Sequence, residues 1–218
     1  MYVFDLDGTL LDSNGIWLDI DIAFLGRHGI DPVPPDYTEY VTHHSSPEAA
    51  AYTRKRFDLG ISSEEIMASW REMAREAYGG TLRLKPGAKP LLMSLRGTGE
   101  KMAVLTSCMP DLCWAALERH GIGELFSGVL TTAELGLEKK DPALYRRAAE
   151  LCDTMPEACT FLDDSPLYCA AARSAGMTVV GVWDPLFSRR EEEVRAASHR
   201  YVRSLEELIP AAAAPGLG

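Results

Sequence analysis

Two aspartates lie close together near the start of the chain, where an apolar run over residues 2–6 ends. They are Asp5 and Asp7, and Gly8 and Thr9 follow them directly. Residues two apart in a strand point the same way, so the two carboxylates are expected to be neighbours. Carboxylates that close repel one another unless a cation lies between them or one of them stays protonated. The spacing therefore predicts a cation site at the carboxyl end of a strand, where open α/β sheets hold their ligands.

A second pair of acids follows another apolar run. Asp163 and Asp164 come directly after residues 159–162, in the stretch TFLDDSP. Adjacent acids are often a helix cap and a solvated side chain, but two strands that each end in paired aspartates favour a shared site. Such carboxylates are hard oxygen ligands suited to Mg²⁺, which takes one or two of them together with waters and a phosphate.

Two weaker patterns add groups that can bind an anion. Thr106 and Ser107 follow the apolar run MAVL, and a hydroxyl with successive backbone N–H groups at a strand end can hold a phosphate oxygen. Lys139 and Lys140 precede an Asp-Pro pair, and a lysine there can neutralise a phosphate or a carboxylate. Taken alone, a Thr-Ser pair after a strand is common, and a Lys-Lys pair is usually solvated surface.

The apolar runs that precede these residues alternate with segments of helical period. Asp141-Pro142 and Ser165-Pro166 have the form of a helix N-cap followed by a first-turn proline. Strands that alternate with helices predict an α/β fold with a Rossmann-like parallel sheet and helices on both faces. The expected strands are Tyr2 to Leu6, Met102 to Leu105, Val129 to Thr131, Cys159 to Leu162 and Thr178 to Trp183.

The segment over residues 15–81 has no convincing strand pattern and is predicted to be helical. One helix is expected from Ile16 to His28, and Ser62 with Glu65 forms a capping box before another. We therefore expect an α/β core over residues 1–14 and 82–210, with a helical subdomain over 15–81 inserted after the first strand. The low-complexity residues 211–218 are expected to fray.

The composition excludes several classes of function. The 218-residue chain carries a net charge of −10, which attracts cations and disfavours nucleic acid and anionic membranes as partners. No apolar run reaches membrane-spanning length, and no signal-peptide pattern begins the chain. Five cysteines without CxxC spacing fit reduced thiols, so we expect a cytoplasmic protein. A monomer is the expected state, with a dimer as the alternative.

The motif order resembles the haloacid dehalogenase-like hydrolase superfamily. The stretch DLDGTLLDS, then Thr106-Ser107, then Lys139, then DDS follow one another between residues 5 and 164, each after or near an expected strand. The helical insertion after the first motif resembles the small α-helical cap of phosphatases and beta-phosphoglucomutase-like members. The resemblance implies a Rossmann-like core whose site the cap closes.

The resemblance also implies roles for individual residues. Asp5 matches the nucleophile that becomes an aspartyl-phosphate, and Asp7 matches the general acid and base. Thr106, with Ser107 beside it, matches the group that binds the transferring phosphoryl. Lys139, rather than Lys140, matches the motif lysine.

The same resemblance implies Mg²⁺ as the cofactor. Asp164 matches a direct ligand of the ion, and Asp163 matches the neighbouring acid that often reaches it through water. Asp5 through its carboxylate and Asp7 through its backbone carbonyl complete the implied protein ligands. In the transition state, Mg²⁺ and Lys139 would offset the charge of the phosphoryl oxygens.

Two positions depart from the family pattern without removing a catalytic group. Lys140 stands where proline is usual, which blurs the register of the catalytic lysine. Tyr168 stands where a glycine commonly follows the DDS motif, so its ring would crowd the loop or line the site entrance.

The function favoured by these residues is a Mg²⁺-dependent phosphatase that acts on a small phosphorylated metabolite. A phosphomutase of the beta-phosphoglucomutase type would use the same groups and return the phosphate to a sugar. A non-catalytic binding relative would be expected to have lost Asp5, Asp7, Lys139 or Asp164, and all four are present. A receiver-type domain shares the residue types, but the DxDGT order and the helical insertion argue against it. Dehalogenation fits poorly, because Asp7 and Gly8-Thr9 suit phosphoryl transfer.

Overall fold

A computed structural model describes residues 1–42, 44 and 46–209, so the tail predicted over 211–218 lies outside the described residues. The chain divides into two compact units. One unit, here called the core, combines residues 1–14 with the chain from Leu82 onward. The other, here called the helical unit, comprises Gly15–Thr81.

The core is built on a six-stranded sheet in which every pairing is parallel. The strand order β3-β2-β1-β4-β5-β6 is that of the doubly wound α/β folds, which confirms the predicted fold class. The strands are β1 (Tyr2–Phe4), β2 (Met102–Thr106), β3 (Gly128–Thr131), β4 (Thr160–Asp163), β5 (Thr178–Val182) and β6 (Arg200–Val202).

The strand register fixes which loops meet at the carboxyl edge of the sheet. Phe4, the last residue of β1, pairs with Leu162 of β4 on one side and with Val104 of β2 on the other. The backbone N–H of Asp5 continues this ladder by donating to the carbonyl of Leu162 at 3.0 Å. Side chains that follow β1 and β4 therefore emerge next to each other.

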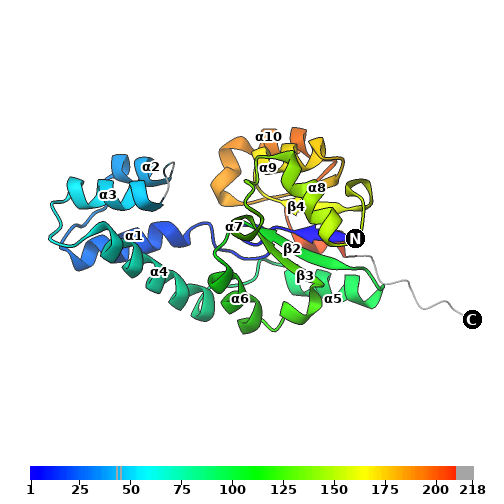
Figure 1. The fold of residues 1–218 in the computed structure, drawn as a ribbon, viewed down its shortest axis with the longest axis horizontal. Helices are drawn as coiled ribbons and strands as arrows, with labels where there is room; N and C mark the ends of the chain where they lie inside the picture. Colours follow the sequence, from blue (N-terminus) through cyan, green and yellow to red (C-terminus); the bar gives the residue numbers. More distant parts are fainter. Residues whose placement is uncertain (43, 45, 210–218) are drawn as a thin grey trace, which may run out of the picture. The chain divides into compact units, whose positions relative to one another are not determined.

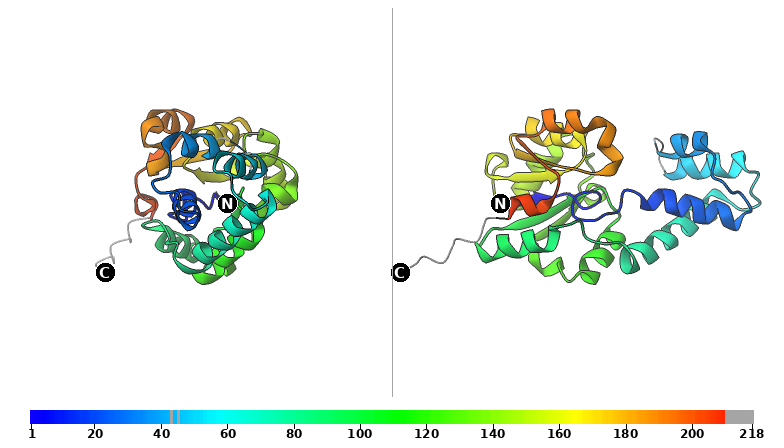
Figure 2. Two further views of the ribbon diagram at one scale, coloured as in Figure 1. Left: turned by 90° about the vertical axis from the view of Figure 1, so that its left-hand side faces the viewer. Right: turned by 180° about the vertical axis from the view of Figure 1, so that it is seen from behind.

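Helices cover both faces of the sheet because alternate strand residues point to opposite sides. Val3 and Phe161 lie in the buried cluster with residues of α8, α9 and α10, whereas Phe4 and Leu162 are buried outside that cluster. Figures 1 and 2 show α8, α9 and α10 on one face and α5 and α6 on the other. The core helices are α5 (Ala88–Gly97), α6 (Pro110–Arg119), α7 (Thr132–Leu135), α8 (Pro142–Leu151), α9 (Pro166–Ser174) and α10 (Glu191–Ala197), with 3₁₀ turns η1 (Gly123–Leu125), η2 (Pro156–Ala158), η3 (Pro185–Arg190) and η4 (Leu205–Leu208).

Some local expectations need correction. Strand β6 was missing from the expected set, because it has only three residues and its first, Arg200, is exposed. Helices α8 and α9 begin at the predicted prolines, and Asp141 caps α8 by accepting the N–H of Ala143 at 2.8 Å. Ser165 stands at the N-cap position of α9, but its side chain makes no capping hydrogen bond.

The helical unit contains four helices within its described residues, namely α1 (Ile16–Arg27), α2 (Pro35–Thr42), α3 (Ser46–Arg56) and α4 (Ser63–Gly80). The predicted capping box starts α4: the Ser62 N–H donates to Glu65 at 2.7 Å, and the Ser62 side chain accepts the Glu65 N–H at 3.2 Å. Ile66 and Trp70 of α4 are buried on one side of that helix, and the Trp70 ring meets Phe24 of α1 edge to face.

A buried carboxyl group lies inside the helical unit. Asp21 of α1 accepts a hydrogen bond from the Tyr37 hydroxyl at 3.2 Å, and that hydroxyl also lies 3.0 Å from the Thr53 hydroxyl. Burial raises the pKa of Asp21 to about 6, although the Tyr37 hydrogen bond lowers it. At neutral pH Asp21 is therefore mostly ionised, but its ionised form is less stable in the folded unit than in the unfolded chain.

We expect Asp21→Asn to stabilise the protein at pH 8 and to have little effect near pH 4. Because the folded pKa lies above the unfolded one, stability conferred by this group is lost as pH rises from about 4 to about 6. The neutral amide keeps an acceptor for Tyr37 and removes that penalty, a gain of about 1–2 kcal/mol at pH 8. Urea unfolding of both proteins at the two pH values measures it; an equal effect at both would contradict the assignment.

Candidate active site

Three buried carboxylates converge at the carboxyl edge of the sheet. Asp5 follows β1, and Asp163 and Asp164 lie at the end of β4. One oxygen from each lies within 4.8 Å of the others. Because β1 and β4 are neighbours in register, residues 158 or more positions apart in the sequence become adjacent here.

One lysine enters this cluster. The ammonium of Lys139 donates to Asp5 Oδ1 at 2.6 Å and to Asp163 Oδ2 at 2.7 Å, and all three side chains are buried. The Tyr145 hydroxyl of α8 donates to the Lys139 carbonyl at 2.8 Å and so fixes the turn that carries the lysine. Lys140 forms a different ion pair: it is exposed and pairs with exposed Glu138 at 2.6 Å.

The acid cluster carries an excess of negative charge whenever its carboxylates are ionised. Burial raises the pKa of Asp5 to about 7, against the opposing effect of Lys139. Burial and the neighbouring carboxylates Asp163 and Asp5 raise the pKa of Asp164 well above its usual value. Burial disfavours the Lys139 ammonium, yet Asp163 and Asp5 raise its pKa well above the usual range, so it stays charged. Three carboxylates and one ammonium leave two negative charges, which a divalent cation with oxygen ligands would balance.

The loop after β1 presses its backbone against the cluster. Gly8 has φ +81°, and a Cβ there would lie 2.3 Å from Asp164 Oδ2, so only glycine allows this approach. The Asn14 amide donates to the same Asp164 oxygen at 2.7 Å. Asp7 lies beside the cluster with its side chain partly exposed, and its Oδ1 accepts the Ser13 hydroxyl at 2.6 Å.

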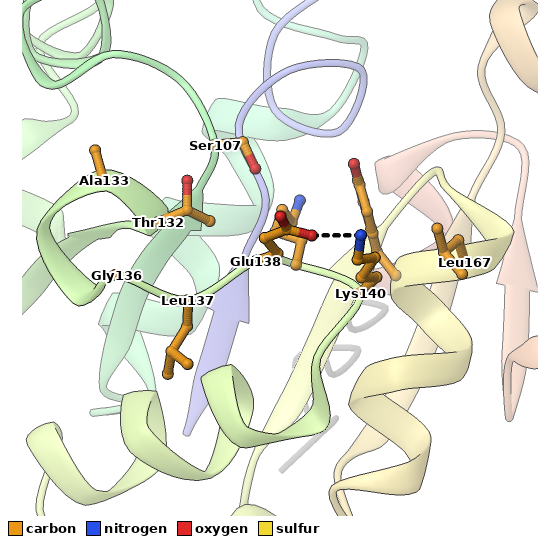
Figure 3. A pocket seen from close by; sticks show the side chains of 10 residues that line it. Ser107, Thr132, Ala133, Gly136, Leu137, Glu138, Lys140 and Leu167 are labelled. Atoms are coloured by element: carbon orange, nitrogen blue, oxygen red, sulfur yellow. Dashed lines mark ion pairs between the residues drawn. The ribbon is translucent and has the colours of Figure 1, made fainter. Parts of the chain in front are cut away.

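The residues after β2 stand at the edge of a cavity of about 460 Å³. Buried Thr106 accepts the N–H of Cys108 through its hydroxyl oxygen at 3.0 Å, which leaves the hydroxyl hydrogen available. Ser107 is exposed and lines the cavity together with Thr132, Leu167 and Lys139. Figure 3 shows Ser107 and Thr132 on one side of this cavity, Leu167 on the other, and the Glu138–Lys140 ion pair between them.

Tyr168 completes the wall of the cavity on the side of the lysine. The Lys139 ammonium lies 4.5 Å from the centroid of the Tyr168 ring, within the range of a cation–π interaction. The Tyr168 ring was expected either to crowd the loop or to line the site entrance. In the structure it lines the cavity.

The fold and the site together define an α/β protein with an acidic, lysine-containing centre at the carboxyl edge of its parallel sheet. The profile of the haloacid dehalogenase-like hydrolase family matches residues 2–182. The chain belongs to this family, which confirms the resemblance drawn from the motifs and the expectation of a hydrolase.

This chain is similar to two phosphatases in sequence and to one solved structure in fold. Phosphoglycolate phosphatase of Pseudomonas putida is 28% identical over 100% of this chain and 81% of its own length. Hexitol phosphatase A of Escherichia coli is 31% identical over 95% of this chain and 92% of its own length. The crystal structure of a proposed beta-phosphoglucomutase from Thermotoga maritima superimposes with a TM-score of 0.83 at 21% identity, and each chain covers 95% of the other. Within residues 1–42, 44 and 46–209, no helix is long and apolar enough to span a membrane.

Two residues that contact the site were missed by the sequence analysis. Asn14 hydrogen-bonds to Asp164 across 150 positions. Lys85 is buried and donates to the Gly8 carbonyl at 2.8 Å. Neither belongs to a recognisable motif, and the only available signal was the DGTLLDSN stretch, which ends at Asn14.

Proposed function

We propose that this protein is a Mg²⁺-dependent phosphatase that hydrolyses a small phosphorylated metabolite through an aspartyl-phosphate on Asp5. The observation that carries the proposal is the contact of Lys139 with Asp5 inside a buried cluster of acids. Such a centre is short of positive charge and suits a metal ion and a phosphate bound together. Membership of the hydrolase family and the two phosphatases among the relatives support the choice of reaction.

The metal would be held chiefly by Asp5 and Asp164. Both oxygens of Asp163 already accept hydrogen bonds, one from Lys139 at 2.7 Å and one from the Ser165 N–H at 2.7 Å. Asp163 therefore suits contact through water, and the backbone carbonyl of Asp7 is the remaining protein ligand. When bound, Mg²⁺ would supply electrostatic stabilisation of the phosphoryl oxygens.

The protein groups divide the remaining work. Asp5 attacks the phosphorus in line and releases the substrate oxygen, which Asp7 protonates. Asp7 then deprotonates the water that hydrolyses the aspartyl-phosphate. Thr106, Ser107 and Lys139 hold the oxygens of the transferring group. The hydrogen bond from Ser13 fixes the Asp7 side chain for both steps.

We infer that the helical unit acts as the cap of this enzyme and sets its substrate preference. Its helices interrupt the core directly after the loop that carries Asp5 and Asp7. A small metabolite phosphate is the substrate class, and sugar and polyol phosphates, phosphoglycolate and nucleoside monophosphates are the compounds to test first. Hexitol phosphatase A and the GMP/IMP nucleotidase of Escherichia coli are relatives that motivate this range.

Phosphate release from these compounds, with Mg²⁺ and with a chelator, tests the proposal. We expect release that needs Mg²⁺ and favours one compound. Conversion of a sugar 1-phosphate to its 6-phosphate without phosphate release would identify a mutase instead. If none of the compounds undergoes either reaction, the proposal that this protein is an enzyme is contradicted.

Mg²⁺ is also expected to stabilise the fold. Binding to the cluster replaces repulsion among Asp5, Asp163 and Asp164, so the melting temperature should rise with Mg²⁺ concentration. Protons compete for the carboxylates, and burial holds the pKa of Asp5 at about 7, so the rise should be larger at pH 8 than at pH 6. Calorimetric melting at matched ionic strength, with Na⁺ as the control, measures both effects. A melting temperature indifferent to Mg²⁺ at pH 8 would contradict this metal site.

A further inference from the structure

One buried lysine in the core has no part in the reaction described above. The ammonium of Lys85 donates to the Gly8 carbonyl at 2.8 Å, to the Trp183 carbonyl at 2.7 Å and to Asp184 Oδ2 at 2.6 Å. A lysine ammonium has three hydrogens, so these bonds satisfy it completely. Three acceptors that converge on one buried nitrogen form a rigid junction.

The junction joins two loops on opposite sides of the acid cluster. Gly8 belongs to the loop after β1, and Trp183 and Asp184 follow β5. Strand β4, whose end carries Asp163 and Asp164, lies between β1 and β5 in the sheet. Lys85 therefore links the loops that flank the two cluster acids.

The backbone around Lys85 is itself attached to the first loop. The Lys85 N–H donates to the Leu10 carbonyl at 2.9 Å, and the Asp12 N–H donates to the Arg83 carbonyl at 2.9 Å. The Gly8 N–H donates to the Leu11 carbonyl at 2.9 Å. Both peptide groups of Gly8 are thus held, one by Leu11 and the other by the Lys85 side chain.

This restraint matters because Gly8 passes so close to Asp164. A carbon atom at its Cβ position would overlap Asp164, so a small rotation of the Gly8 backbone changes the space left for that carboxylate. The Asp7 carbonyl shares a peptide group with the Gly8 N–H. The orientation of that carbonyl therefore depends on how firmly Gly8 is held.

Lys85 also neutralises a negative charge near the cluster, that of Asp184. Asp184 is buried, and its charge is one of those that raise the pKa of Asp164, after burial, Asp163 and Asp5. The Lys85–Asp184 pair is neutral as a unit. Removing the lysine alone would leave Asp184 as an unpaired buried charge, which is strongly destabilising.

We propose that Lys85 is a positioning residue that holds the Gly8 turn in the conformation the metal site requires. The proposal rests on the proposed function, because it takes the acid cluster to be a Mg²⁺ site. Its effect should appear in the affinity for the ion itself, before any substrate is present.

The test uses Lys85→Met combined with Asp184→Asn, which removes the junction and leaves the net charge unchanged. The amide can still accept the Leu186 N–H that Asp184 caps at 2.9 Å. Replacing both members of a buried pair is commonly tolerated, unlike removal of one. Lys89→Met is the matched control, since Lys89 is an exposed lysine of α5 that bonds only to the His120 carbonyl among the described contacts.

Calorimetric titration with Mg²⁺, well below the melting temperature of each protein, is the measurement. We expect the dissociation constant to rise by about tenfold or more in the double variant and to stay within about twofold in Lys89→Met. Lys85→Arg is a second variant, because a planar guanidinium cannot donate from one nitrogen to all three acceptors. We expect it to raise the dissociation constant several-fold while keeping the charge.

Equal Mg²⁺ affinity in the wild type and in these folded Lys85 variants would overturn the inference and leave the proposed function intact. A wild-type protein that binds no Mg²⁺ would overturn the proposed function and this inference with it. If the double variant does not fold, the result for Lys85→Arg decides the inference.

Discussion

Asp5→Asn is expected to abolish phosphate release, with a loss in kcat of at least about four orders of magnitude. The amide cannot attack phosphorus, and both oxygens of the neighbouring Asp163 are already held by hydrogen bonds. The fold should be preserved, since the amide oxygen can still accept the hydrogen bond from Lys139. Phosphate release at saturating substrate and Mg²⁺, with circular dichroism as the check on folding, measures the effect.

A matched control for this substitution lies in the same loop. Asp12→Asn changes an exposed aspartate seven positions further on and should leave kcat within about twofold of the wild type, as surface substitutions usually do. Substantial Mg²⁺-dependent turnover by Asp5→Asn would refute the assignment of Asp5 as the nucleophile. A similar loss in both variants would mean that the loop, rather than the carboxylate of Asp5, is responsible.

The second large effect is expected at Lys139. Lys139→Met removes the only ammonium that contacts the acid cluster within the described residues, and kcat should fall by about 10³-fold or more. The same substitution should destabilise the protein by about 3–5 kcal/mol, because it leaves buried carboxylates without their partner. Kinetics and urea unfolding of one preparation measure the two effects.

Lys140→Met separates these effects from a general loss of positive charge. Lys140 is exposed and forms an ion pair with exposed Glu138, so both kcat and stability should stay close to wild type. Lower activity in Lys140→Met than in Lys139→Met would shift the register of the motif lysine by one residue. Equal losses in both would favour a role for overall charge at the cavity.

The parts of the core that could be predicted from the sequence are those encoded by continuous patterns. Strands β1, β2, β4 and β5 are apolar runs, and parallel strands present their carboxyl ends at one edge, so the convergence of Asp5 with Asp163 and Asp164 follows from topology. Strand β6 has three residues and an exposed start, which gives no such pattern.

The side-chain contacts of the site depend on tertiary structure, so they were harder to predict from the sequence. Nothing in the pair Lys139-Lys140 decides which lysine is buried; that follows from the turn held by Tyr145. The partners of Lys85 are 77 to 99 positions away in the sequence. Unlike the acids at the strand ends, these partners belong to no motif or periodic pattern in the sequence.

A covalent phosphoryl group at Asp5 is the central requirement of the proposed mechanism. Enzyme quenched in acid during steady turnover, reduced with borohydride and digested, can be analysed by mass spectrometry. Reduction of an aspartyl-phosphate yields homoserine, and we predict homoserine at position 5 and not at position 7, only when Mg²⁺ and substrate are both present. Turnover with no modified residue, or with the modification at another aspartate, would contradict the mechanism.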